Sequence, residues 1–202
     1  RRYDIGYFIY IGGNDSMDTV AKLSDYAREH APDISVMGAP KTIDNDLCGM
    51  DHSPGFLSAA KYVATTFAEL SCDCSAYDVP SVTIVEVMGR NAGWLTATSV
   101  LAREKAGDAP HLIYLPEVPF SAQKFVADVK DKLASHRSVL VAISEGIRNP
   151  DGSYVSAGFG IVERDAFGHQ ALTGANRVLE HIVRTEIGCK CRAIELSLMQ
   201  RC

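Results

Sequence analysis

Apolar runs of strand length alternate along the chain with segments whose apolar residues recur at helical spacing. The runs at residues 82–87 and 139–143 are rich in Val, Ile and Leu, as buried strands are. The β-α-β alternation predicts an α/β fold with parallel sheets and flanking helices. Predicted strands are 7–11, 34–37, 82–87, 112–115, 139–143 and 192–196, and predicted helices are 18–30, 56–70, 91–105, 173–187 and one that Ser121 caps.

Polar clusters follow several of these predicted strands. They occupy residues 12–16, 41–46 and 88–90, and Glu145 follows a further strand. In parallel α/β folds, ligands bind at the carboxyl ends of the strands. The clusters therefore predict a shared binding cleft.

The first cluster contains Gly12 and Gly13 followed by Asp15. A Gly-Gly pair lets backbone N–H groups approach a phosphate closely, although most such pairs are simply turns. The carboxylate of Asp15 could hold Mg²⁺. Asp18 is a candidate helix cap instead.

The second cluster contains Lys41, Thr42, Asp44 and Asp46. In an extended segment the two aspartates would share one face, where one could act as a general base and the other could position a metal or water. The alternative is a pair of turn or capping residues. Lys41 and Thr42 favour the functional interpretation, because both suit a transferring phosphoryl group.

Three arginines are candidates for binding phosphate: Arg90, Arg192 and Arg201. A lone arginine is usually on the surface or in an ion pair. Arg90 follows a Met-Gly pair at a strand end, and this position favours phosphate binding over an ordinary surface role. Glu145, also after a strand, could accept hydrogen bonds from a sugar hydroxyl.

The composition and charge of the chain argue against some classes of protein. The sequence is 47% hydrophobic, with mean hydropathy near zero and a net charge of −5. This balance argues against a general nucleic-acid binder, and no apolar run is long enough to span a membrane. The six cysteines are expected to be reduced thiols of a cytoplasmic protein. Because the chain starts at Arg1 and ends on a dense polar motif, we expect it to be an internal fragment, incomplete at both ends.

The polar runs closely resemble the phosphofructokinase family, in order and over nearly the whole chain. The most specific are the Thr-Ile-Asp-Asn-Asp run at 42–46 and the Met-Gly-Arg run at 88–90. Other matching runs are 12–16, 51–56, 91–93, 116–117, 144–146, Arg192 and 200–201. The resemblance implies Rossmann-like parallel sheets, with residues 1–55 in a phosphoryl-donor domain and 56–202 in a sugar-phosphate domain.

The resemblance also implies roles in phosphoryl transfer to fructose 6-phosphate, with Mg²⁺ as cofactor. Asp44 would take the proton of the 1-hydroxyl, and Thr42 and Asp46 would support the phosphoryl group and metal. Substrate contacts would come from Gly12, Gly13, Thr42, Ile43, Asp44, Met88, Gly89, Arg90, Glu145, Arg192 and Arg201, and metal contacts from Asn14, Asp15 and Asp46.

Two positions indicate pyrophosphate as the phosphoryl donor. Asp15 and Lys41 match the pyrophosphate-dependent members, whereas ATP-dependent members typically carry glycine at both places. A carboxylate at Asp15 would repel the α-phosphate of a nucleotide, and the ammonium of Lys41 could neutralise pyrophosphate. The reaction should run in both directions, in glycolysis.

The sequence departs from the family pattern at three positions. Asn14 stands where many members have an aspartate, so metal binding would move to Asp15 or Asp46. Ser81 and Leu198 replace an arginine and a histidine of ATP-dependent members. Two rivals stay open: an ATP-dependent 6-phosphofructokinase and a non-catalytic regulatory subunit of the same fold. A homo-oligomer, dimer or tetramer, is expected.

Overall fold

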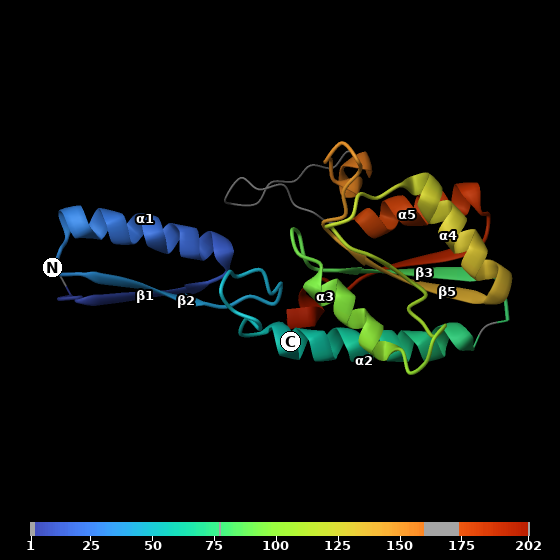
Figure 1. Cartoon of the computed structure of the whole chain (residues 1–202), viewed down its shortest axis with the longest axis horizontal. Coiled ribbons are helices and arrows are strands. Elements are labelled where there is room, and N and C mark those ends of the chain that lie inside the picture. The colour runs from blue at the N-terminus through green and yellow to red at the C-terminus, as the bar shows by residue number, and fades with distance from the viewer. Residues whose placement is uncertain (1–2, 77, 160–173, 202) are drawn as a thin grey trace. The chain divides into compact units, whose positions relative to one another are not determined.

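The computed structural model describes residues 3–76, 78–159 and 174–201. The chain divides into two compact units, Arg1–Leu57 and Ser58–Cys202. The first contains a two-stranded sheet and the second a four-stranded sheet (Figure 1). The donor and sugar-phosphate roles of the two parts stay predictions.

In the first unit, two parallel strands pack against one long helix. The elements are β1 (Tyr7–Gly12), α1 (Asn14–His30) and β2 (Ser35–Pro40). Gly12 lies opposite Pro40, so both strands end at the same edge. Helix α1 starts four residues before its predicted start at residue 18, because Gly13, with extended backbone angles, already serves as its N-cap.

The second unit is a parallel sheet in the order β4-β5-β3-β6. Helices α4 and α5 lie on one face and α2 and α3 on the other (Figure 1). The strands are β3 (Ser81–Val87), β4 (Leu112–Tyr114), β5 (Ser138–Ser144) and β6 (Lys190–Glu195). The helices are α2 (Phe56–Ser75), α3 (Trp94–Ala97), α4 (Ala122–Ser135) and α5 (Ala175–Glu186), with 3-10 turns at Thr98–Ala102, Val155–Phe159 and Ser197–Arg201.

Because helices cover both faces, the central strands β3 and β5 consist mostly of apolar residues. Val82 and Ile84 of β3 are fully buried against Phe125 of α4 and Leu179 of α5. On the opposite face, Thr83 accepts a hydrogen bond from Cys74 Sγ of α2 at 3.4 Å. The predicted parallel α/β architecture is confirmed.

One predicted helix is wrong in extent. The pattern predicts a helix over 91–105, but α3 covers only four residues before a 3-10 turn. Gly93 is the N-cap of α3, and its N donates to Glu117 Oε1 at 2.7 Å. After the turn, Arg103 Nε donates to Pro110 O at 2.9 Å and its backbone is extended.

The starts of α4 and α5 were also predicted from the sequence. Ser121 caps α4, because its Oγ accepts from Lys124 N at 3.3 Å, as predicted. Residue 173, the predicted start of α5, lies outside the described residues. Within the described part of the chain, none of the helices has the length and apolar character needed to cross a membrane.

Candidate functional site

The loops that follow β1 and β2 meet at the carboxyl edge of the two-stranded sheet. Lys41 N donates to Gly12 O at 2.8 Å, directly after the last residue pair of the two strands. A side chain at Gly12 would collide with Ser16, whose Oγ lies 2.0 Å from the position of a Cβ there. Glycine is therefore required where the chain turns from β1 into α1.

A side-chain contact joins the same two loops. Asn14 Nδ2 donates to Asp46 Oδ2 at 2.9 Å, and Asn14 Oδ1 accepts from Asp15 N at 2.8 Å. The side-chain amide of Asn14 thus donates to the loop after β2 and accepts a hydrogen bond at the start of α1. The structure brings together the metal-binding candidates Asn14 and Asp46 and places Asp15 beside them.

Asp46 lies in a partly buried, negatively charged environment. Burial raises the pKa of its carboxyl above the ordinary value, and the negative charge of Asp15 raises it further. Its second oxygen, Oδ1, is buried and has no hydrogen-bond partner. A buried carboxylate oxygen without a donor favours a cation or a proton at that place.

The loop between β2 and α2 is ordered by its own polar groups. Asn45 Nδ2 donates to Asp51 O at 3.0 Å, and Asn45 Oδ1 accepts from Ser53 N at 2.7 Å. Thr42 Oγ1 accepts from Asp44 N at 3.1 Å. These bonds hold Asp44, which is partly buried, in one backbone position.

The extended geometry predicted for residues 44–46 is wrong. Asn45 has a φ of 57°, in the left-handed region, so the chain turns between the two aspartates. The alternation of a strand therefore does not apply to Asp44 and Asp46. After the turn, Asp46 reaches the start of α1, as its bond with Asn14 shows.

In the second unit, the backbone after β3 is held by three side chains. Met88 N donates to Gln200 Oε1 at 3.1 Å, and Gly89 N donates to Glu145 Oε1 at 3.2 Å. Ser144 Oγ donates to Gly89 O. The predicted residues Met88, Gly89 and Glu145 thus lie together at the carboxyl edge of the four-stranded sheet.

Two glycines allow this close packing. Gly89 has a φ of 136°, which L side chains rarely adopt. A Cβ at Gly146 would lie 2.0 Å from Arg90 O, so the backbones after β3 and β5 touch. The contact fixes the backbone that carries Arg90, whose side chain is partly exposed.

The two remaining arginines have different surroundings. Arg201 is exposed and ends the 3-10 turn that follows β6. Arg192 lies opposite Thr83 within β6, three residues before Glu195, and its Nη1 is 3.2 Å from Asp73 Oδ2 of α2. Arg201 thus lies in the turn beyond the end of β6, whereas Arg192 lies about 10 Å before that strand end.

Two buried polar residues at this edge were given no role from the sequence. Gln200 is 1% exposed, and Glu86 is 2% exposed although it belongs to an apolar strand. Burial raises the pKa of Glu86 to about 7, and the charges of Glu195 and Glu145 add to the rise. Its carboxylate accepts from Asn176 N at 2.8 Å, at the start of α5. A glutamate within a Val-Ile run was the signal that could have identified it.

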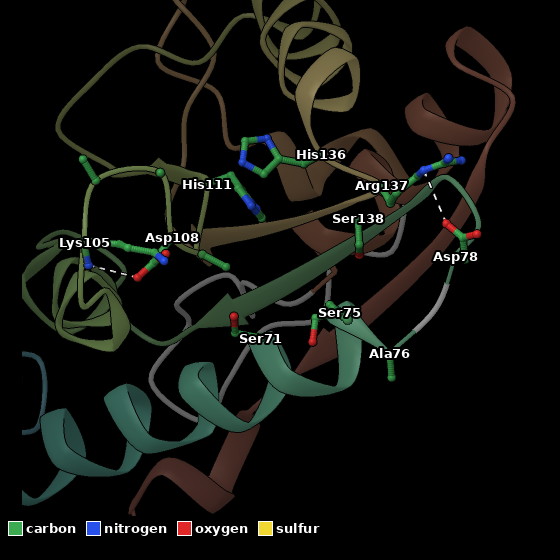
Figure 2. Close-up of a pocket in the computed structure, with 14 residues that line it drawn as sticks. Ser71, Ser75, Ala76, Asp78, Lys105, Asp108, His111, His136, Arg137 and Ser138 are labelled. Atoms are coloured by element: carbon green, nitrogen blue, oxygen red, sulfur yellow. Dashed lines mark hydrogen bonds and ion pairs between the residues drawn. The ribbon is translucent and has the colours of Figure 1, made fainter.

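A separate cavity of about 610 Å³ opens at the amino-terminal edge of the same sheet (Figure 2). Arg137 pairs there with Asp78 at 3.4 Å. Burial lowers the pKa of His111 to about 4, with a further contribution from the charge of His136, so His111 is neutral at pH 7. None of the predicted site residues lines this cavity.

Comparisons with known proteins match the whole chain. The phosphofructokinase family model matches residues 1–202. The pyrophosphate–fructose 6-phosphate 1-phosphotransferase of Rhodospirillum rubrum is 43% identical over 100% of this chain and 50% of its own length. The ATP-dependent 6-phosphofructokinase 2 of Streptomyces coelicolor is 31% identical over 100% of this chain and 54% of its own length.

A solved structure gives the same result for the fold. The crystal structure of the pyrophosphate-dependent phosphofructokinase of Marinobacter aquaeolei matches with a TM-score of 0.80 and 36% identity, covering 100% of this chain and 46% of that one. The chain therefore spans about half the length of the relatives that it matches. With a family match over all of its residues and the same parallel α/β fold, the chain belongs to the phosphofructokinase family.

Proposed function

We propose that the complete protein transfers a phosphoryl group from pyrophosphate to the 1-hydroxyl of fructose 6-phosphate, reversibly and with Mg²⁺. The products are fructose 1,6-bisphosphate and phosphate. The transfer is direct, so catalysis consists of positioning and charge stabilisation. The relative from Rhodospirillum rubrum is named for this reaction.

The junction of the two loops in the first unit carries the proposal. Lys41 N bonds Gly12 O, and Asn14 bonds Asp46, so a cation, a hydroxyl and several carboxylates gather where two parallel strands end. The N-terminus of α1 begins at the same place, and its N–H groups and dipole favour phosphate. This combination suits a phosphoryl donor with bound metal.

Asp44 is assigned as the general base toward the 1-hydroxyl. A carboxylate in this role must be held in a fixed position, and the bond from Asp44 N to Thr42 Oγ1 supports that requirement. In the second unit, Met88, Gly89, Arg90 and Glu145 bind the sugar. Arg201 binds its 6-phosphate. Arg192 lies earlier along β6, where it pairs with Asp73, so it is given no phosphate role here.

Asp15 and Lys41 are assigned as the donor-selecting pair. Both are exposed at the carboxyl edge of the two-stranded sheet. A carboxylate in the first turn of α1 disfavours the extra phosphate of a nucleotide, and an ammonium balances the compact charge of pyrophosphate.

The residues present fit a magnesium site in which oxygen atoms of the substrates would complete the coordination of the ion. Asp46 Oδ1 is buried without a donor, and Asp15 is near enough for its charge to act on Asp46. Mg²⁺ in phosphoryl-transfer sites commonly takes one or two carboxylates and several phosphate or water oxygens. Among the described residues, no group of three or more His, Cys, Asp or Glu side chains could hold a metal ion. When bound, the ion supplies charge neutralisation to the phosphates.

The rival with most support is an ATP-dependent enzyme. A relative named as ATP-dependent is 31% identical over the whole chain, so the family match alone does not choose the donor. The charges of Asp15 and Lys41 favour pyrophosphate as the donor. A non-catalytic subunit of the same fold would not need Asp44 and Lys41, and both are present.

The direct test follows phosphorus atoms through the reaction. The complete gene product is mixed with fructose 6-phosphate, pyrophosphate and MgCl₂, and ³¹P NMR records the species present. We expect pyrophosphate to disappear while orthophosphate and a second sugar phosphomonoester appear in equal amounts. A sample without fructose 6-phosphate controls for hydrolysis of pyrophosphate. Orthophosphate without a new sugar phosphate, or no change at all, would contradict the proposal.

A further inference from the structure

Gln200 is a buried amide between two segments of the proposed sugar-phosphate site. It is 1% exposed, whereas its neighbours Leu198 and Met199 are 67% and 62% exposed. The turn Ser197–Arg201 thus points two apolar side chains outward and a polar one inward. Burying an amide in this way is unfavourable unless its polar atoms are bonded.

Both ends of the Gln200 amide are bonded, and to different segments. Oε1 accepts from Met88 N at 3.1 Å, across 112 positions of sequence. Nε2 donates to Ser197 O at 2.9 Å, within its own turn. Since one partner is a backbone donor and the other a backbone acceptor, only one orientation of the amide satisfies both.

The turn that Gln200 closes is strained. Ser197 has a φ of 45°, in the left-handed region that non-glycine residues seldom adopt. Such a conformation persists where surrounding contacts fix it. The bond from Gln200 to Ser197 O is one of these contacts, and Leu196 N bonding Glu86 O at 3.1 Å is another.

We propose that Gln200 is a positioning residue that fixes the distance between the sugar-binding backbone at Met88 and the phosphate-binding Arg201. Arg201 follows Gln200 directly, and Gly89 follows Met88, so one side chain ties the two substrate-binding segments together. This inference rests on the proposed function. It predicts that Gln200 acts on the affinity for fructose 6-phosphate and leaves the affinity for pyrophosphate unchanged.

The first test is steady-state kinetics of Gln200→Ala in the complete gene product. Without the amide, Met88 N is unsatisfied and the turn is released, so KM for fructose 6-phosphate should rise roughly tenfold or more. KM for pyrophosphate should stay at the wild-type value. Tyr114→Phe is the matched control. It removes the bond from Tyr114 Oη, in β4 of the same sheet, to Asp128 Oδ2 of α4, and it touches no proposed ligand contact.

The second test is a pH-dependent rescue in Gln200→Glu. An ionised carboxylate would repel Ser197 O, whereas a protonated one has an O–H donor and a carbonyl acceptor, as glutamine does. The charged groups around position 200 are Glu86, Glu145 and Glu195, which line the same small cavity, and the adjacent Arg201. We expect the ratio of the variant's KM for fructose 6-phosphate to that of wild type to fall toward one as the pH is lowered from 8 to 6.

The outcomes separate this inference from the proposed function. If both Gln200 variants lower the stability to urea but keep the wild-type KM for fructose 6-phosphate, Gln200 is purely structural and the inference is wrong. If Gln200→Ala does not fold, Gln200→Glu alone decides. A ratio of its KM for fructose 6-phosphate to the wild-type KM that does not change with pH would also show that the inference is wrong. If the wild-type protein itself does not convert fructose 6-phosphate, the proposed function fails first.

Discussion

Asn14 and Asp46 are joined by a hydrogen bond of 2.9 Å across 32 positions of sequence. The bond occupies Asp46 Oδ2 and leaves Oδ1 buried without a donor. Because an amide stands at position 14, Asp46 meets a donor there and not another negative charge. The donor at position 14 therefore offsets part of the repulsion between the two carboxylates, Asp15 and Asp46.

Asn14→Asp should make the stability of the protein depend on Mg²⁺. The substitution removes the donor and adds a third carboxylate, so the free energy of unfolding in EDTA should fall by about 1–3 kcal/mol. Asn14→Ala, which adds no charge, should lose less. Urea unfolding with EDTA and with MgCl₂ measures both effects, and Mg²⁺ should restore stability mainly to Asn14→Asp. Equal losses in the two variants, with no response to Mg²⁺, would contradict this account of the site.

Asp44→Asn should abolish most turnover while leaving substrate binding nearly intact. An amide cannot take the proton of the 1-hydroxyl, so kcat should fall by roughly 10²–10⁴. Asp33→Asn is the matched control, because Asp33 is exposed in the turn before β2. Steady-state kinetics with both substrates gives the comparison, and a wild-type kcat in Asp44→Asn would remove Asp44 from its assigned role.

Glu86 should make the stability fall as the pH rises from 4.5 to 7. Its pKa is raised from 4.5 to about 7, so the folded state holds a proton that the unfolded state has released. The contribution is therefore fully present below pH 4.5 and is lost through pH 7, in total roughly 3 kcal/mol. Glu86→Gln should flatten this part of the profile, whereas Glu69→Gln, on the exposed side of α2, should not. Urea unfolding at several pH values decides between a flattened and an unchanged profile.

Asp15→Gly should weaken the discrimination against nucleotides. Removing the carboxylate from the first turn of α1 removes its repulsion of additional phosphate, so kcat/KM for ATP should rise. Asp18→Gly repeats the same change three residues along the helix at an exposed position and controls for the loss of helix stability. If ATP use is the same in Asp15→Gly and Asp18→Gly, Asp15 does not select the donor.

The sequence predicts the sheet well because its strands are buried on both faces. Segments 82–87 and 139–143 consist mainly of Val, Ile and Leu, and they lie within β3 and β5. The helix predicted at 91–105 shortens to Trp94–Ala97 and a 3-10 turn, and the contacts at its two flanks, Gly93 with Glu117 and Arg103 with Pro110, are not visible in any local pattern. The loops after β1 and β2 were predictable as partners, since parallel strands end at one edge.

The side chains that organise the site were less predictable. Gln200 bonds a backbone group 112 positions away, and Glu86 bonds one 90 positions away. Polar residues with such partners can be recognised only after the fold brings the segments together. The turn at Asn45 likewise depends on its bonds to Asp51 and Ser53, which displaced the extended geometry expected between Asp44 and Asp46.

The most direct test of the central claim compares the two donors in one preparation of the complete wild-type protein. The measurement is kcat/KM for pyrophosphate and for ATP, with saturating fructose 6-phosphate and Mg²⁺. With Asp15 and Lys41 at the ends of β1 and β2, we predict efficient turnover with pyrophosphate and little or none with ATP. Turnover with ATP and none with pyrophosphate would contradict the account of the donor site.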